Sequence, residues 1–224
     1  MSQTAYDAGL DAFRASMAEA VEAGAGKPWR VSGRATKANP NKEDGSWWYS
    51  NGPSFVHAYY AWRLNNPHLK IWTTPAGVPA IELEVAVEIG NDTKIKGGID
   101  RVFVNEQDGE RLIVDLKSGK APSSGLQLAV YRLALLKQFG DAPRYGAYWL
   151  AREGQHGQIF DLHQYHEDMV ARWMRDVYKA INLGIFVPNM GQLCDYCGVR
   201  KDCYAFGSTT YVPDFNNDLI EESK

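Results

Sequence analysis

The sequence predicts an α/β protein in which helices flank a central sheet, because two kinds of hydrophobic period alternate along the chain. Residues 4–23 and 165–182 carry apolar side chains at helical spacing, whereas residues 81–89 alternate between apolar and polar. The 224 residues are 45% hydrophobic and 23% charged, which is enough for one globular core and excludes a wholly disordered chain.

The first two predicted elements are helices. The helix over residues 4–23 carries one apolar face, formed by Tyr6, Leu10, Phe13, Met17 and Val21. Gly24 and Gly26 follow and favour a helix end there. A second helix is expected over residues 54–65, because Pro53 suits the first turn of a helix.

Three strands follow the helices. They are expected over residues 81–89, 95–104 and 111–117. Residues 90–92 and 105–109 separate them and have the composition of turns. Because short connections join antiparallel neighbours, the three strands are predicted to form an antiparallel meander.

The remaining elements alternate between helix and strand. A helix is expected over residues 125–139, with Ser123 or Ser124 as its N-cap and Gly140 at its end. Strands over 145–151 and 158–162 and a helix over 165–182 complete the order.

Charge is unevenly distributed. The chain has 24 basic and 27 acidic residues, and its last eleven residues hold four of the acids and one of the bases. The rest is therefore neutral, which does not indicate a nucleic-acid binder but is compatible with a local basic groove. Residues 27–42 hold five bases and no acid, as expected of a solvated loop or of a mobile arm on a phosphate backbone.

The composition also bears on location. The apolar runs are much shorter than a membrane span, and no basic segment followed by an apolar one opens the chain as a secretion signal would. The three cysteines cluster near the C-terminus, and their odd number argues against a disulfide framework. We therefore expect a cytoplasmic protein with no membrane association.

Acidic and basic side chains gather at the ends of two predicted strands. Asp115 and Lys117 are two residues apart and share one strand face, and Asp100 lies on the neighbouring strand. Two carboxylates in an apolar sheet repel each other unless a cation lies between them, and Mg²⁺ or Mn²⁺ takes oxygen ligands. Lys117 could then position a water or neutralise charge on a phosphate. The alternative is a structural salt bridge between Asp115 and Lys117.

Two further groups have spacings that suggest a role. Gln127 and Tyr131 are four residues apart and therefore share one face of the predicted helix. They are expected either to lie beside this site or to be an ordinary amide at a helix start and a half-buried tyrosine. Three thiols can converge on one metal ion or cluster, and the chain has a C-x2-C-x5-C run, Cys194, Cys197 and Cys203. We expect a structural metal there; the sequence does not identify a fourth ligand.

Three of these segments together resemble one family. Residues 98–101 (Gly-Ile-Asp-Arg), 115–119 (Asp-Leu-Lys-Ser-Gly) and 127–131 (Gln-Leu-Ala-Val-Tyr) are similar to the RecB-type branch of the PD-(D/E)xK nucleases. That branch includes the RecB and AddB nuclease domains and the RecB-like exonucleases of CRISPR adaptation. The resemblance covers residues 57–203 and implies a restriction-endonuclease-like core, with a central mixed sheet flanked by helices and a C-terminal cysteine-rich metal-binding segment.

The resemblance also implies a ligand set. His57 matches the histidine on a preceding helix that holds the metal with the two aspartates, here Asp100 and Asp115, and the Leu116 backbone carbonyl helps. One or two Mg²⁺ or Mn²⁺ ions are expected.

Other family features carry over less completely. Gln127 and Tyr131 match a motif implied to contact DNA and brace the site. Glu84 is one match for an upstream acid, although Glu82 and Glu88 share its strand face. In iron–sulfur members a fourth cysteine near the N-terminus joins the C-terminal three, and this chain has none there. A [4Fe-4S] cluster and Zn²⁺ therefore both stay open.

The predicted function is that of a Mg²⁺- or Mn²⁺-dependent DNA exonuclease that acts on single strands or duplex ends in recombination, repair or replication. The alternative is a non-catalytic DNA-binding or assembly module that keeps the fold and a structural metal. One nuclease domain is expected over 1–224: an N-terminal helix and basic loop (1–52), a catalytic core (53–184), the cysteine-rich segment (185–208) and an acidic tail (209–224).

Overall fold

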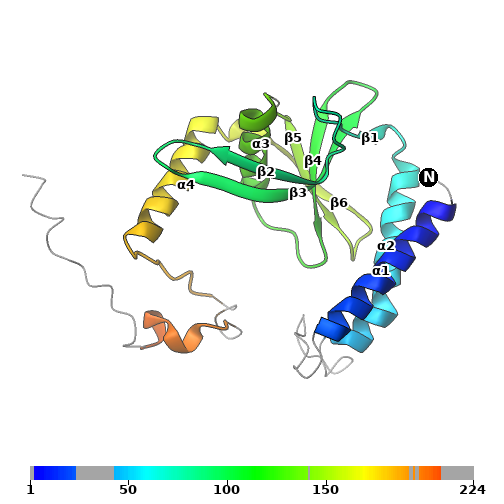
Figure 1. The fold of residues 1–224 in the computed structure, drawn as a ribbon, viewed down its shortest axis with the longest axis horizontal. Helices are drawn as coiled ribbons and strands as arrows, with labels where there is room; N and C mark the ends of the chain where they lie inside the picture. The colour runs from blue at the N-terminus through cyan, green and yellow to red at the C-terminus, as the bar shows by residue number, and fades with distance from the viewer. Residues whose placement is uncertain (1–2, 24–42, 141, 192–193, 195–196, 208–224) are drawn as a thin grey trace, which may run out of the picture. The chain divides into compact units, whose positions relative to one another are not determined.

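The computed structural model describes residues 3–23, 43–140, 142–191, 194 and 197–207, which form two compact units (Figure 1). The first lies within residues 1–88 and 94–170, and the second within 89–93 and 171–224. The predicted basic segment 27–42 and the acidic tail lie outside the described residues. The single nuclease domain over the whole chain stays a prediction.

A six-stranded mixed sheet forms the centre of the first unit, as the sequence predicts. Its strands are β1 (Leu69–Ile71), β2 (Ile81–Glu88), β3 (Lys94–Asn105), β4 (Arg111–Lys117), β5 (Tyr145–Leu150) and β6 (Gln155–Asp161). They run in the order β1-β3-β4-β5-β6, with β2 also paired to β3. The β4–β5 pair is parallel and every other pair is antiparallel. The predicted meander of β2, β3 and β4 is confirmed.

Helix α2 (Gly45–Asn65) packs along α1 (Gln3–Ala23), and the second half of α2 packs on one face of the sheet through Trp62 (Figure 1). Trp62 lies in a buried cluster with side chains of four strands, Leu69, Phe103, Val114 and Trp149. The Trp62 ring centroid is 5.8 Å from that of Phe103 and 6.3 Å from that of Trp149. Through Phe103 and Val114, this cluster ties α2 to β3 and β4, the strands that carry Asp100 and Asp115.

The predicted start of α2 at residue 54 was wrong. Asp44 caps the helix, because its Oδ1 accepts a hydrogen bond of 2.9 Å from the Trp47 backbone N–H. Pro53 therefore lies inside the helix rather than in its first turn. A proline inside a helix removes one backbone hydrogen bond, so a proline in the sequence normally indicates the start of a helix rather than its interior.

Helix α3 (Leu126–Phe139) covers the other face and buries Leu128, Ala129 and Leu133. The predicted cap by Ser123 or Ser124 was wrong: Gly125 occupies the N-cap without a side-chain hydrogen bond. A Cβ at Gly125 would lie 2.9 Å from Phe160 Cγ, so only glycine fits this approach to β6. The helix ends at Gly140, which is left-handed with φ of 69°, as predicted.

The second unit holds residues 171–182 of α4 (Glu167–Asn182), the turn between β2 and β3, and two short 3-10 helices at Arg200–Asp202 and Tyr204–Phe206. Arg175 Nη1 donates a hydrogen bond of 2.7 Å to the Ile89 carbonyl, and Tyr204 OH donates one of 3.0 Å to the Phe186 carbonyl. Among the described helices, none has a stretch long and apolar enough to cross a bilayer.

The contact of Gly125 with Phe160 gives a stability prediction. Gly125→Ala should lower the free energy of unfolding by about 1–3 kcal/mol, because the added Cβ overpacks the junction of α3 and β6. Thermal and urea unfolding measure this change. Gly119→Ala is the control, since a Cβ there meets nothing within 4 Å; equal stability of the two variants would contradict the packing argument.

Candidate active site

The site lies where β3 and β4 separate. The last paired residues are Arg101 and Val114, so Asp100 and Asp115 follow at adjacent positions of the two strands. Val102 pairs with Ile113, and alternation therefore places both carboxylates on the α3 face of the sheet. Asp115 is 3% exposed, so its charge is almost fully removed from water.

Asp100 faces the backbone of the neighbouring strand. Its Oδ2 accepts a hydrogen bond of 2.6 Å from the Leu116 N–H. The N–H and C=O of one strand residue point to the same side, so the Leu116 carbonyl also faces the Asp100 side of β4. The Leu116 side chain packs against the Trp62 cluster on the opposite face. This residue thus offers a backbone oxygen to the site and a side chain to the core.

Asp115 is held by three neighbours. Lys117 Nζ lies 2.6 Å from its Oδ2 as an ion pair. Gln127 Nε2 donates a hydrogen bond of 3.0 Å to Oδ1, and Tyr131 OH donates a longer one of 3.4 Å to the same atom. Within the described residues, the Lys117 ammonium is the only group paired with Oδ2. A buried carboxylate oxygen whose one partner is a cation can also accept a metal ion if that ammonium shifts.

Gln127 links the charged groups. Its Oε1 accepts from Lys117 Nζ at 3.2 Å, while its Nε2 donates to Asp115 and, at 2.8 Å, to Tyr131 OH. The amide orientation is fixed, since exchanging its oxygen and nitrogen would break the bonds to Lys117 and Asp115. The spacing of four residues predicted that Gln127 and Tyr131 share a face, and the structure places both beside Asp115.

Burial raises the pKa of the Asp115 carboxyl; the Lys117 ammonium opposes this rise and the Asp100 charge adds to it. The pKa of Tyr131 is also raised, chiefly by burial. Burial and the nearby Asp115 charge raise the pKa of Tyr148 to about 12. Both tyrosines therefore stay protonated at neutral pH. A divalent cation would offset the unfavourable charge on the buried Asp115 carboxylate. The oxygens of Asp100, Asp115 and Leu116 are of the type that Mg²⁺ and Mn²⁺ bind.

His57 and Glu84 are not brought to these groups. The His57 side chain is exposed, and its ring lies edge-on to Tyr6 of α1 at 5.7 Å between centroids. Glu84 is exposed, with its carbonyl 3.4 Å from Gln138 Nε2. The described part of the chain contains no group of three or more His, Cys, Asp or Glu residues placed to hold a metal ion. The role of His57 as a ligand stays a prediction.

The cysteines lie in the second unit. Cys194 and Cys203 are half-buried, Cys197 is exposed, and all three are free thiols. Successive backbone turns connect them, from Cys197 N to Cys194 O at 3.3 Å and from Cys203 N to Arg200 O at 3.2 Å. Their convergence on one metal ion or cluster stays a prediction.

Tyr148 was missed by the sequence interpretation. It lies opposite Asp115 in the parallel β4–β5 register, 5.7 Å from Lys117 Nζ to its ring centroid. Its OH donates a hydrogen bond of 3.0 Å to the Ser124 carbonyl, just before α3. No local pattern reveals this neighbour, because it depends on a pairing across a helical crossover.

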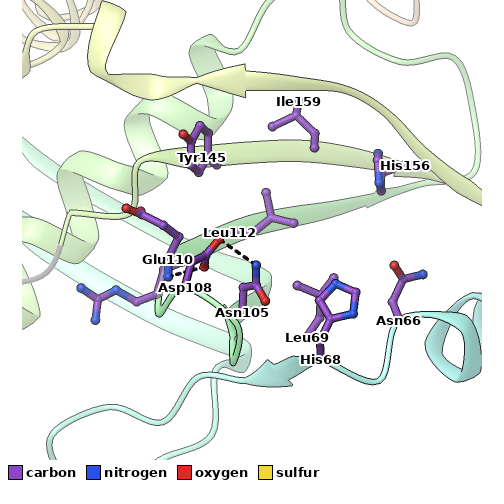
Figure 2. Close-up of a pocket in the computed structure, with 11 residues that line it drawn as sticks. Asn66, His68, Leu69, Asn105, Asp108, Glu110, Leu112, Tyr145, His156 and Ile159 are labelled. Carbon is purple, nitrogen blue, oxygen red and sulfur yellow. Dashed lines mark hydrogen bonds between the residues drawn. The ribbon is translucent and has the colours of Figure 1, made fainter.

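A separate pocket of about 250 Å³ lies at the other end of β4 and β5 (Figure 2). Its lining includes Leu112, Tyr145, Ile159 and two histidines, His68 and His156. None of the predicted site residues lines it. The pocket is therefore distinct from the Asp115 site.

Residues 5–204 match the family model of the PD-(D/E)XK nuclease superfamily. The chain belongs to this superfamily, which indicates a nuclease and confirms the resemblance at that level. Two relatives are proteins of mycobacteriophages. The Gene 69 protein of Mycobacterium phage D29 is 31% identical over 197 residues, covering 78% of this chain and 70% of that protein. The Gene 69 protein of Mycobacterium phage L5 is 28% identical over 209 residues, covering 75% and 69%. Neither name describes an activity.

The raised pKa of Asp115 gives a prediction on stability. An acid with a pKa above its unfolded value makes the fold most stable at low pH, and this contribution is lost as pH rises through the folded pKa. Asp115→Asn should therefore raise the melting temperature by a few degrees at neutral pH without metal. Mg²⁺ or Mn²⁺ should raise the melting temperature of the wild type but not the melting temperature of Asp115→Asn. Thermal unfolding between pH 4 and 8, with EDTA or with either metal, measures both effects.

Asp161→Asn is the matched control with the opposite sign. Hydrogen bonds from Arg144 lower the pKa of Asp161, so its neutralisation should reduce stability at neutral pH. A melting temperature that falls equally in both variants would contradict the buried-charge argument.

Proposed function

We propose that the chain is a metal-dependent DNA exonuclease of the RecB type, hydrolysing phosphodiester bonds in recombination, repair or replication. The observation that carries this proposal is the network of Asp100, Asp115, Lys117 and Gln127 at the end of β4. Asp100, Asp115 and the Leu116 carbonyl would hold Mg²⁺ or Mn²⁺, with His57 as the proposed fourth ligand. When bound, the ion polarises the scissile phosphate and acidifies its water.

Lys117 has a defined task in this proposal. Its ammonium donates to Gln127 Oε1 and pairs with Asp115. From there it would donate to the attacking water or to a phosphoryl oxygen, where negative charge grows. As the water oxygen bonds to phosphorus, the bond from phosphorus to the leaving oxygen breaks; the attacking water gives its proton to solvent, and the leaving oxygen takes one from solvent. Because its ammonium is already in contact with Gln127 and Asp115, the lysine is oriented before substrate arrives.

Gln127 and Tyr131 support the charged pair. Gln127 keeps the Lys117 ammonium and the Asp115 carboxylate in one geometry, and Tyr131 stays a donor because its pKa is raised. We propose that these two residues position the site and contact the DNA backbone. Exonuclease action on single strands or duplex ends rests on the resemblance of residues 98–101, 115–119 and 127–131 to the RecB branch.

The rival function is a non-catalytic DNA-binding or assembly module. The neutral body of the chain and the lack of an N-terminal cysteine favour it. Against it stands the buried Asp115, whose unfavourable charge a module freed from catalysis could replace by an apolar side chain at no cost. The nuclease is therefore the better-supported proposal.

Lys117→Ala should slow DNA cleavage with Mg²⁺ or Mn²⁺ by roughly 10²–10³-fold, because the growing charge on the phosphate loses its donor. Degradation of end-labelled linear single strands and duplexes measures the rate. Lys137→Ala is the control, since this exposed lysine lies in the last turn of α3. Undiminished cleavage by the Lys117 variant would refute the assignment.

The same assay tests the exonuclease proposal. Closed circular single strands and circular duplexes should resist the wild-type protein while their linear forms are degraded. Cleavage of circles at the rate of linear DNA would indicate an endonuclease instead.

We further propose that Cys194, Cys197 and Cys203 bind an iron–sulfur cluster or Zn²⁺ that stabilises the C-terminal segment. The wild-type protein purified without oxygen should contain stoichiometric iron with visible absorption, or stoichiometric zinc without it. Cys203→Ser should lose that metal and melt at a lower temperature. Elemental analysis and absorption spectra measure this; a metal-free wild type purified in this way would contradict the proposal.

A further inference from the structure

The first turns of α2 carry an aromatic cluster that the proposed mechanism does not use. It consists of Trp47, Trp48 and Phe55, whose ring centroids lie 5.1–6.2 Å apart. All three side chains are half-buried rather than enclosed in the core. They are separate from the Trp62 cluster, which is buried under the second half of the helix.

The position of these rings on the helix explains their partial exposure. Residues 47–49 are consecutive, and successive helical positions are rotated by about 100°. Trp47, Trp48 and Tyr49 therefore cannot all face the sheet, and Tyr49 is 45% exposed. A contiguous apolar patch at a surface commonly marks an interaction site, whereas single exposed apolar side chains do not.

Arg152 contacts both this cluster and the strand end that carries Lys117. Its guanidinium lies over the rings of Trp47 and Phe55, at 5.2 and 5.8 Å from their centroids. Its Nε donates a hydrogen bond of 2.7 Å to the Ser118 carbonyl, one residue beyond Lys117. Its Nη2 donates to Glu43 Oε1 at 2.8 Å, which holds the guanidinium in place.

The sheet topology makes this proximity a fixed feature. β4 and β5 are parallel, so Ser118 and Arg152 emerge at the same edge, where the Ala151 N–H donates to the Lys117 carbonyl at 2.9 Å. Next to Ser118 in the chain, a Cβ at Gly119 would meet nothing within 4 Å, and Lys120 is exposed. An exposed lysine beside open backbone suits a phosphate of a nucleic-acid chain.

We propose that the aromatic cluster stacks the bases of single-stranded DNA whose phosphate lies in the Asp115 site. Bases of a duplex stack on one another and do not offer their faces, whereas unpaired bases stack on aromatic rings regardless of sequence. The inference rests on the proposed nuclease function and narrows its substrate to a single strand or a single-stranded overhang.

The test is binding to two oligonucleotides in EDTA: oligodeoxythymidylate and an abasic chain of equal length, with the same phosphates but no bases. Trp48→Ala should weaken oligodeoxythymidylate binding by roughly 5–100-fold, the loss expected for one stacked base, and leave abasic binding unchanged. Fluorescence anisotropy gives the affinities. Trp48→Phe should keep most of the affinity and shows that the effect is stacking rather than misfolding.

Tyr145→Ala is the matched control, because Tyr145 lies at the opposite end of β5 in the separate pocket (Figure 2). It should bind both chains as the wild type does. Equal losses of Trp48→Ala on the two chains, or no loss on either, would overturn the stacking proposal.

A second readout separates this failure from that of the nuclease proposal. Hydrolysis of bis(4-nitrophenyl) phosphate needs the site but no bases, so Lys117→Ala should reduce it and Trp48→Ala should not. If Lys117→Ala reduces hydrolysis but the bases do not contribute to binding, the stacking proposal is wrong and the nuclease proposal stands. If the bases contribute to binding but no hydrolysis is observed, the nuclease proposal is wrong and the protein is a module that binds single strands.

Discussion

The buried carboxylate of Asp115 is the constraint on which the rest of the site depends. It is almost fully removed from water and adjacent to a second acid, so its ionised form is unfavourable without compensation. Lys117 and Gln127 supply part of that compensation, one at each carboxylate oxygen. An apolar residue at position 115 would avoid the cost of burying an ionised carboxylate. Retaining it is consistent with a site that binds a cation and a phosphate, as membership in a nuclease superfamily indicates.

Much of the site could be predicted because it depends on local periodicity. Alternation along one strand placed Asp115 and Lys117 together, and helical spacing placed Gln127 and Tyr131 together. The adjacency of Asp100 followed from a short turn between antiparallel strands. Each of these inferences needs only a few residues of sequence, and each agrees with the contacts in the structure.

What could not be predicted depends on distant partners. Tyr148 reaches the site through the parallel pairing of β4 with β5, and Arg152 reaches Ser118 across the same edge. β1 has three residues, too few to show a period. The start of α2 was not predicted because Pro53 resembles a proline in the first turn of a helix. The N-cap of α3 was not predicted because packing against Phe160 leaves room only for glycine at residue 125, although serines precede it in the sequence. In these cases tertiary packing overrode a local preference.

The segment from β4 to β5 has a consequence for the order in which the site forms. Residues 111–150 supply Asp115, Lys117, Gln127, Tyr131 and Tyr148, so most of the site's contacts are short-range in sequence and close small loops. Asp100 comes from β3, which a short turn joins to β4, so the loop that brings it to Leu116 spans only 16 residues. The longest loop in the site is the one between Asp115 and Tyr148, which closes when β4 pairs with β5. The two like charges are therefore brought together by a local hairpin, whereas Tyr148 depends on the slower parallel pairing.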